Sequence, residues 1–320
     1  KQAIDAMPAE IATEREWRFW RAEAEQRLGR TAAARAAWRE LADTPDYHGF
    51  LAADRLGIRY PLPDEAEAPP EPTSAEIAEL EGRSWLSLAF ALQRLDRPAD
   101  ARRLFIHALD TVPEERLPAL AWVADRAGWP DRASVVLARM QAFHAPEWLA
   151  ARYATPYRAL VEAQAMRQSI PAAWVYSVMR RESLFMRDIG SGAGAQGLMQ
   201  LMPTTARWIN RQADLGLAPL RLTDPGTNIA LGAAYLGHMA ERFDERYPLA
   251  IAAYNAGPGR AVDWLPEVPL PGDVWVDTIL FDETRAYAHA VLAGMVIYQW
   301  RLTGRPERLG TLLPVIPSAD

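Results

Sequence analysis

The chain has 320 residues, of which 50% are hydrophobic and 24% are charged, and its formal net charge is −6. This composition is typical of a folded globular protein, and the length allows two or three domains of roughly 100–200 residues each. A net negative charge argues against a nucleic-acid partner, because phosphate binding requires a basic surface. No run of about 18 apolar residues is present, so we expect no transmembrane segment.

The chain begins at Lys1, without an initiator Met and without a signal segment. We therefore expect a processed or truncated piece of a longer protein. The sequence contains no cysteine, which excludes disulfides, zinc–thiolate sites and cysteine nucleophiles.

The first 150 residues are rich in Ala, Leu, Arg and Glu, which favours helices. A short pattern recurs there three times. The copies are Arg27-Leu28-Gly29-Arg30, Arg94-Leu95-Asp96-Arg97 and Arg126-Ala127-Gly128-Trp129, followed by Ala34, Ala101 and Ala133 respectively. Gly or Asp suits the end of one helix, and Pro98 and Pro130 suit the first turn of the next. The pattern predicts stacked helical hairpins, as in an α-solenoid.

Five prolines lie between Pro61 and Pro72, which excludes a helix interior there. We expect a linker or surface strap and a domain boundary. From about Ala151 the sequence is rich in glycine, with four glycines in residues 190–197. A separate helical domain with an unusual turn is therefore expected in the second half.

Three helix starts can be placed in that second half. Pro171 suits a first turn, Asp224-Pro225 combines an N-cap residue with a proline behind it, and Asp282 precedes a helix expected from about Glu283 to Trp300. The segment Pro171–Phe185 contains no helix breaker after its first residue.

That segment carries a carboxylate on an apolar face. Four apolar residues repeat at helical spacing, namely Trp174, Val175, Val178 and Met179. Glu182 continues the same face. Burial of a charged carboxylate is costly, so its pKa should rise, and a protonated Glu suits a general acid for glycosidic cleavage. The alternative is that Glu182 ends its helix, turns outward and pairs with Arg180 or Arg181.

Several motifs surround this residue in a fixed order. They are Glu182-Ser183, the Gly-rich run that ends in Gly197-Leu198-Met199-Gln200-Leu201-Met202-Pro203, then Ala252-Ala253-Tyr254-Asn255-Ala256-Gly257-Pro258-Gly259, and Glu283-Thr284-Arg285-Ala286-Tyr287. In order and spacing this set resembles the lysozyme-like catalytic domain of the soluble lytic murein transglycosylases, over roughly residues 153–300. Upstream, Trp17-Arg18-Phe19-Trp20 and the Pro-rich segment resemble the end of that family's helical superhelix and the start of its linker domain.

The resemblance implies an all-α fold in three parts. Residues 1–72 would be the end of the superhelix, residues 73–150 a small helical linker domain, and residues 151–320 the lysozyme-like domain with at most a small β-hairpin. A fragment that begins near Ala151 is expected to fold alone, because the motifs and their apolar faces lie within it.

The resemblance also implies roles for single residues. Glu182 would be the catalytic acid/base. Ser191 would supply a hydroxyl near that carboxylate, Met199 an apolar wall of the cleft, Gln200 an amide for sugar hydroxyls or N-acetyl groups, and Tyr254 a phenol that reaches the catalytic region.

Two further substrate-binding residues have structural alternatives. Asn255 begins the turn after its helix, and Glu283 lies in a first helical turn, where its charge matches the helix dipole. Arg285 and Tyr287 are weaker candidates. The glycines of residues 190–197 would provide a tight turn and a close approach of the backbone to the ligand.

Most glycosidases use two carboxylates. Asp188 is nearest in sequence but is expected to be a solvated loop residue, and Glu283 is the other candidate. The resemblance implies a single carboxylate, with the substrate's own N-acetyl group supporting the reaction centre and its own 6-hydroxyl attacking C1.

The implied protein is a lytic transglycosylase that cleaves the β-1,4 bond between N-acetylmuramic acid and N-acetylglucosamine and leaves 1,6-anhydromuramoyl ends. Its partners would be peptidoglycan glycan strands and peptide stems, and cell-wall synthesis proteins are a further expectation. The implied location is the periplasm of a Gram-negative bacterium, with outer-membrane association through a missing N-terminal part. Two alternatives are a hydrolase of the same fold, in which water attacks, and a non-catalytic scaffold that holds glycan.

Neither a metal nor a cofactor is expected. The five histidines are scattered along the sequence without metal-ligand spacing and are expected to be surface or packing residues: His48, His107, His144, His238 and His289. No phosphate loop is present, and Gly190-x-Gly192-x-Gly194 lacks the strand–helix context of a dinucleotide site.

Overall fold

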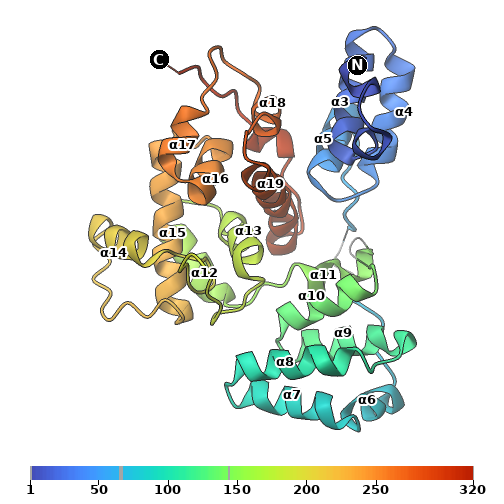
Figure 1. Cartoon of the computed structure of the whole chain (residues 1–320), viewed down its shortest axis with the longest axis vertical. Coiled ribbons are helices and arrows are strands. Elements are labelled where there is room, and N and C mark those ends of the chain that lie inside the picture. Colours follow the sequence, from blue (N-terminus) through green and yellow to red (C-terminus); the bar gives the residue numbers. More distant parts are fainter. Residues whose placement is uncertain (1, 65–67, 143–144, 320) are drawn as a thin grey trace. The chain divides into compact units, whose positions relative to one another are not determined.

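The computed structural model describes residues 2–64, 68–142 and 145–319 (Figure 1). The chain is 65% helical, and no β-strand occurs within the described residues, so the expected all-α fold class is confirmed. Isolated β-bridges pair Gly190 with Gln196, Gln196 with Leu201, and Leu270 with Ile316, which agrees with the expectation of at most a small β-hairpin. Over the described ranges, no helix combines the length and the apolar character needed to cross a membrane.

The chain forms two compact units. One consists of residues 1–64 and 236–320, and the other of residues 65–235. The second boundary falls inside a long helix, α15 (Pro225–Arg242). These units run across the three expected segments, whose boundaries at residues 72 and 150 stay a prediction.

The unit of residues 65–235 begins with helical hairpins (Figure 1). Its helices before α15 are α6 (Ser74–Glu81), α7 (Ser84–Arg94), α8 (Pro98–Leu109), α9 (Leu117–Arg126), α10 (Pro130–Arg139), α11 (Leu149–Arg152), α12 (Arg158–Arg167), α13 (Ala172–Ser183) and α14 (Pro203–Gln212). Helix α7 packs against α8, and α9 packs against α10. The rings of Phe105 and Trp129 meet edge to face at 5.2 Å in the core of these hairpins.

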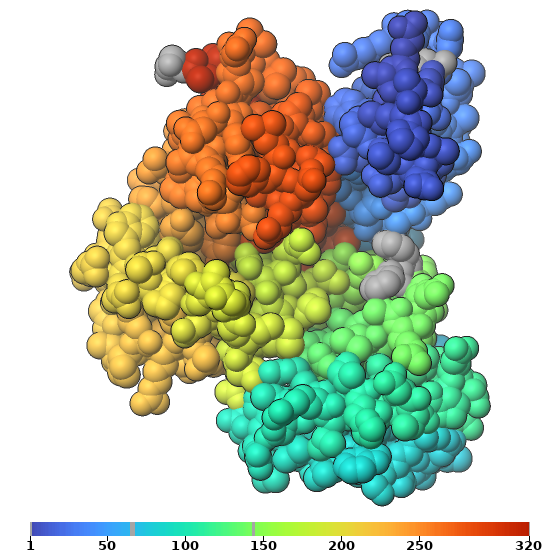
Figure 2. Space-filling view, viewed as in Figure 1, coloured from blue at the N-terminus to red at the C-terminus, as the bar shows by residue number. Residues whose placement is uncertain are grey.

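The other unit joins the two ends of the chain. Its helices are α1 (Gln2–Asp5), α2 (Ala9–Ala12), α3 (Arg15–Arg27), α4 (Thr31–Ala42), α5 (Tyr47–Leu56), α16 (Tyr247–Ala256), α17 (Pro258–Asp263), α18 (Gly272–Asp277) and α19 (Asp282–Thr303). Helix α5 packs against α19 and the short helix η3 (Leu309–Leu312). Figure 2 shows the blue N-terminal residues beside the orange and red C-terminal ones.

The three repeated turns adopt one conformation, which confirms the predicted hairpins. In each copy the third residue has a positive φ: 77° at Gly29, 59° at Asp96 and 66° at Gly128. The fourth residue donates its backbone N–H to the carbonyl five positions earlier, over 2.9, 2.9 and 3.0 Å, which is the Schellman arrangement. The alanines that follow, Ala34, Ala101 and Ala133, have no exposed surface. Their small side chains allow the paired helices to approach closely.

The Pro-rich segment starts as a strap on the surface of α19. Tyr60 and Leu62 are buried, and the indole of Trp300 donates to the carbonyl of Pro63 over 3.0 Å. Residues 65–67, which belong to the expected linker, lie outside the described residues.

Candidate active site

Glu182 lies in the last turn of α13, which starts behind Pro171 as expected. The apolar face is confirmed, since each of its four predicted members is fully buried: Trp174, Val175, Val178 and Met179. Glu182 itself is half-buried. Arg180, a partner in the alternative interpretation, donates from Nε to the carbonyl of Arg152 over 3.1 Å and lies over the ring of Tyr153 at 4.5 Å.

The helix does not extend to the end of the segment Pro171–Phe185. It ends at Ser183, because Leu184 and Phe185 have φ angles of 48° and 68°. Two successive residues with side chains in the left-handed region are strained, at a cost of about 1–2 kcal/mol each. The turn is held from within, since the backbone N–H of Phe185 donates to the Ser183 hydroxyl over 3.1 Å. A strained, fixed backbone therefore follows Glu182 directly.

Ser183 connects this helix end to the Gly-Leu-Met-Gln loop. Its side chain is buried, and its Oγ donates to the carbonyl of Leu198 at 2.7 Å and lies 3.1 Å from that of Met179. The residue next to Glu182 thus fixes the loop against α13. The sequence interpretation quoted Ser183 within a motif but gave it no role.

A second anchor, Asn228 of α15, was missed. It is fully buried, its Oδ1 accepts from the backbone N–H of Met199 over 2.8 Å, and its Nδ2 donates to the carbonyls of Gln196 and Leu222 over 3.0 and 2.8 Å. Gly197 has a φ of 79°, and a Cβ there would lie 2.4 Å from Asn228 Nδ2. The Cβ would also lie 2.0 Å from the backbone carbonyl oxygen of Leu222, so the close approach that requires a glycine is made to both Leu222 and Asn228. The available signal was an asparagine directly before the apolar run Ile229–Leu236.

Three predicted substrate-binding residues belong to the same unit as Glu182. Ser191 is exposed, and its Oγ accepts from the backbone N–H of Ala195 over 3.0 Å. Met199 is fully buried, and its side chain packs against Gly232 of α15, where an added Cβ would lie 2.1 Å from the Met sulfur. Gln200 is half-buried, and its amide donates to the carbonyls of Ile189 and Gly197 over 3.1 and 2.9 Å. All three shape the loop, and their contact with substrate stays a prediction.

The other three predicted residues belong to the unit of residues 1–64 and 236–320. Tyr254 is half-buried in α16, and Glu283 is exposed in the first turn of α19. Asn255 lies inside the last turn of α16, and the turn after the helix starts at Gly257, so the expected position was two residues early. Its Oδ1 accepts from the hydroxyl of the buried Thr284 over 2.7 Å. Asn255 thereby holds the helix turn that carries Glu283.

The expectation that Asp188 is a solvated loop residue is wrong. Its two oxygens accept from the two terminal nitrogens of Arg102 on α8, over 2.8 and 2.7 Å. The adjacent Arg187 pairs with Asp96 in the turn before α8. Burial raises the pKa of Asp188, but the hydrogen bonds and charge of Arg102 outweigh this effect, so the pKa lies below its ordinary value of 3.8. An ionised carboxylate committed to Arg102 is a poor general base.

Two of the five histidines are also not scattered in space, contrary to expectation. His48 and His289 face the same carboxylate, that of Asp277. His107 is exposed, and His144 lies outside the described residues.

Known proteins resemble this chain over nearly its whole length. Residues 159–269 match the family model described as the Transglycosylase SLT domain. The soluble lytic murein transglycosylase of Escherichia coli is 28% identical over 306 residues, which cover 94% of this chain and 46% of that protein. The protein of the same name from Salmonella typhimurium is 29% identical over 309 residues, 95% of this chain and 46% of its own length.

Solved structures agree with these sequence matches. The inactive mutant of lytic transglycosylase Slt from Pseudomonas aeruginosa superposes with a TM-score of 0.85 at 34% identity, over 96% of this chain and 49% of that one. The complex of the 70 kDa soluble lytic transglycosylase with bulgecin A gives 0.85 at 26% identity, over 95% and 49%. The chain thus spans about half the length of the relatives it matches. Sequence and fold agree over that half, and this chain is similar there to the soluble lytic murein transglycosylases, with the SLT domain match at residues 159–269.

Proposed function

We propose that this chain carries the catalytic part of a lytic transglycosylase, which cleaves the β-1,4 bond between N-acetylmuramic acid and N-acetylglucosamine in peptidoglycan. The observation that carries the proposal is the setting of Glu182. This half-buried carboxylate ends an apolar helix face, inside the region that matches the SLT domain. The Pseudomonas aeruginosa relative supports it, since replacement of one glutamate by glutamine gives an inactive mutant of that protein.

In the proposed reaction Glu182 acts twice. It first protonates the glycosidic oxygen, so that the bond from C1 of N-acetylmuramic acid to that oxygen breaks. The N-acetyl group of the same sugar supports the positive charge at C1. The ionised Glu182 then accepts the proton of the 6-hydroxyl as its oxygen bonds to C1. The product is a 1,6-anhydromuramoyl end, and no water is consumed.

Six residues are proposed to contact the glycan strand or to shape the loop that contacts it. They are Ser191, Met199, Gln200, Tyr254, Asn255 and Glu283. For Met199 the complete burial of the side chain in the described structure favours an indirect role, in which it shapes the loop from behind. The proposed domain organisation has three segments. Residues 1–72 are the end of a superhelix, residues 73–150 a linker domain and residues 151–320 the catalytic domain.

The proposed surroundings are those of cell-wall turnover. The chain would act on glycan strands that carry peptide stems, in the periplasm of a Gram-negative bacterium. The names of its relatives, which act on murein, support this setting. Contact with cell-wall synthesis proteins and association with the outer membrane through a further N-terminal part are finer proposals.

The chemistry of the product ends tests the reaction. Purified peptidoglycan is digested, and the muropeptides are separated and weighed before and after borohydride treatment. Anhydro ends resist reduction and are one water lighter than hydrolysed ends. Predominantly reducible ends would identify a hydrolase instead, with Glu283 as the first candidate for the base that activates water.

A further inference from the structure

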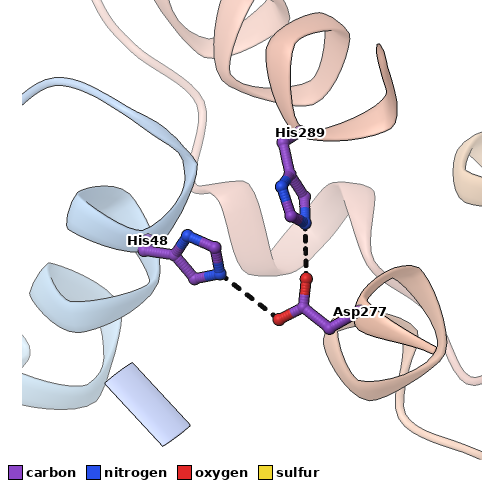
Figure 3. Close-up of side chains that lie close together, drawn as sticks. All are labelled: His48, Asp277 and His289. Atoms are coloured by element: carbon purple, nitrogen blue, oxygen red, sulfur yellow. Dashed lines mark hydrogen bonds and ion pairs between the residues drawn. The ribbon is translucent and has the colours of Figure 1, made fainter. Parts of the chain in front are cut away.

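The carboxylate of Asp277 lies between two imidazole rings, and each ring faces a different oxygen (Figure 3). His48 comes from α5, Asp277 from the end of α18 and His289 from α19. The Nε2 atom of His48 lies 3.3 Å from Oδ2, and the Nε2 atom of His289 hydrogen-bonds to Oδ1. One ligand-type atom from each residue lies within 4.8 Å of the other two. One helix from the N-terminal part of the chain and two from the C-terminal part thus bring three ligand-type atoms close together.

The cluster is buried and its side chains are held by neighbours. The exposed fractions of the side chains are 8% for His48, 5% for Asp277 and 17% for His289. The indole of Trp20 donates to Asp277 Oδ2 over 2.6 Å. The ring of Tyr47 stacks on His289 at 4.4 Å and meets His48 edge to face at 5.1 Å. Outer contacts of this kind orient the ligands of metal sites.

The charges around the cluster are also unusual. Glu16, in the first turn of α3, is a second partly buried carboxylate that lies within electrostatic range of Asp277 and both rings. The cation that faces Glu16 is Arg285, whose Nε lies 3.8 Å from it and which also pairs with the exposed Asp282. Arg285 is thus divided between Glu16 and Asp282. An added cation at the cluster would be attracted by the carboxylates of Asp277 and Glu16.

We propose that His48, Asp277 and His289 bind one divalent transition-metal ion of the Zn²⁺ type. Two imidazole nitrogens and one carboxylate suit such an ion, whereas Mg²⁺ and Ca²⁺ prefer oxygen ligands throughout. Two ligands on a tetrahedral zinc ion lie about 3.3 Å apart, given metal–ligand distances of about 2.0–2.1 Å. The separation of 3.3 Å between His48 and Asp277 meets this requirement, whereas His289 Nε2 is in a short hydrogen bond to Asp277 Oδ1 and would move away from it to bind the ion. The ion would replace the two hydrogen bonds between the imidazoles and Asp277. Each imidazole would bind the ion through Nε2 in its neutral form, with its proton on Nδ1.

The proposed ion would have a structural effect within its own unit. It would join α5, from the N-terminal part of the chain, to α18 and α19, from the C-terminal part. Three protein ligands leave a fourth position for water. This proposal does not depend on the proposed reaction, because its tests measure binding and stability.

Metal binding to the full chain provides the test. The chelator-treated protein is titrated with Zn²⁺ by calorimetry and with Co²⁺ by visible absorption, and its thermal midpoint is measured with and without Zn²⁺. We expect one ion per chain, a higher midpoint with Zn²⁺, and no saturable binding of Mg²⁺. His48→Gln and His289→Gln should each weaken Zn²⁺ binding at least tenfold. The exposed His107→Gln variant is the matched control and should bind as the unaltered chain does.

A measurement on the unaltered protein covers the case in which the variants fail to fold. The ring signals of its five histidines are followed by NMR during the zinc titration. Selective changes at the His48 and His289 rings would support the site. The proposal is overturned if the unaltered chain shows no saturable zinc binding, if binding survives in folded His48→Gln and His289→Gln variants, or if the rings that respond are others. A purely hydrogen-bonded cluster would then remain.

Discussion

Glu182 and Ser183 are neighbours in the chain but have different roles. The glutamate is half-buried at the end of an apolar helix face, whereas the serine is buried and bonded to the loop that carries Met199 and Gln200. The acid is thus followed directly by a fixed backbone, held through Ser183 and through the strained turn at Leu184 and Phe185.

Replacement of the proposed acid should abolish activity and preserve the fold. Glu182→Gln keeps the shape of the side chain but removes proton transfer, which contributes about 10²–10⁴-fold to a rate and here serves both half-steps. The rate of release of soluble muropeptides from peptidoglycan measures the loss. Glu241→Gln, which alters an exposed carboxylate of α15, is the control. A Glu182→Gln protein within tenfold of the unaltered rate would remove Glu182 from the role of acid/base.

Removal of the buried amide at Asn228 should destabilise the loop. Asn228→Ala leaves one N–H and two carbonyls in the interior without this partner, and each such group costs about 1–3 kcal/mol. We expect the free energy of unfolding, measured in urea, to fall by at least about 2 kcal/mol. Gln212→Ala, at an exposed amide of α14, should change it by less than about 0.5 kcal/mol. Equal small effects from both would mean that water replaces Asn228 without cost.

These residues differ in how far the sequence revealed them. The apolar face that ends in Glu182 follows from residue spacing within one helix, so it could be predicted. The partners of Ser183 and Asn228 lie 15 and 29 positions away, at Leu198 and Met199. No local pattern identifies such contacts, because they depend on how α13, α15 and the loop pack together.

At the scale of elements, the turn before α8 and the start of that helix hold the loop that follows Glu182. Arg102 binds Asp188 through two hydrogen bonds, and Asp96 binds the neighbouring Arg187. The hairpin of α7 and α8 therefore contributes to the placement of residues 187–188, within one compact unit.

The Arg102–Asp188 pair should contribute a stability that depends on pH. The pKa of Asp188 is lower in the folded chain than its ordinary value of 3.8, so the carboxylate stabilises the fold above that pH. The contribution is complete at neutral pH and is lost as the pH falls through the folded-state pKa. Arg102→Gln should cost about 1–2 kcal/mol at pH 7, a value reduced for partial exposure.

Urea unfolding of both proteins between neutral and acidic pH measures this difference. The gap between the unaltered chain and Arg102→Gln should shrink as the pH falls below 3.8. Arg103→Gln is the matched control, because its side chain is 79% exposed and pairs with Asp100 instead. A gap that stays constant over the whole pH range would mean that Arg102 stabilises the fold by packing alone.

The ends of the elements were predictable to different degrees. The repeated turns could be placed because Gly or Asp and the prolines behind them identify where helices stop and start. The end of α13 could not, since Leu184 and Phe185 adopt left-handed conformations without any glycine or proline. Tertiary contacts, among them the Ser183 hydrogen bonds, impose that end.

At the scale of the whole molecule, the two ends of the chain share one compact unit. Helix α5 packs against α19 and η3, and Trp300 of α19 binds the carbonyl of Pro63. The sequence predicted the helices but not this pairing, because an apolar face does not identify the distant segment that covers it.

This packing changes the expectation for a fragment that begins at Ala151. The fragment retains every catalytic motif but uncovers the faces of α19 and η3 that α5 covers in the full chain. We expect its thermal midpoint, measured by circular dichroism, to lie clearly below that of the full chain. A mixture of separately made fragments 1–72 and 151–320 should have a thermal midpoint between that of fragment 151–320 and that of the full chain. Equal midpoints for fragment and full chain would show that the N-terminal helices add nothing to the stability of this unit.

The repeated turn also bears on how such a chain diversifies. Two copies use glycine at the left-handed position, and the third uses Asp96, whose carboxylate reaches Arg187. Glycine and aspartate codons differ by one nucleotide, and a turn built around glycine already has the backbone that aspartate tolerates there. A new ion pair can therefore arise at such a turn in a single mutational step, without rearrangement of the helices on either side. In a fold made of repeated hairpins, substitutions at the turns can therefore create or remove contacts to neighbouring loops. The helices on either side of the turn stay the same.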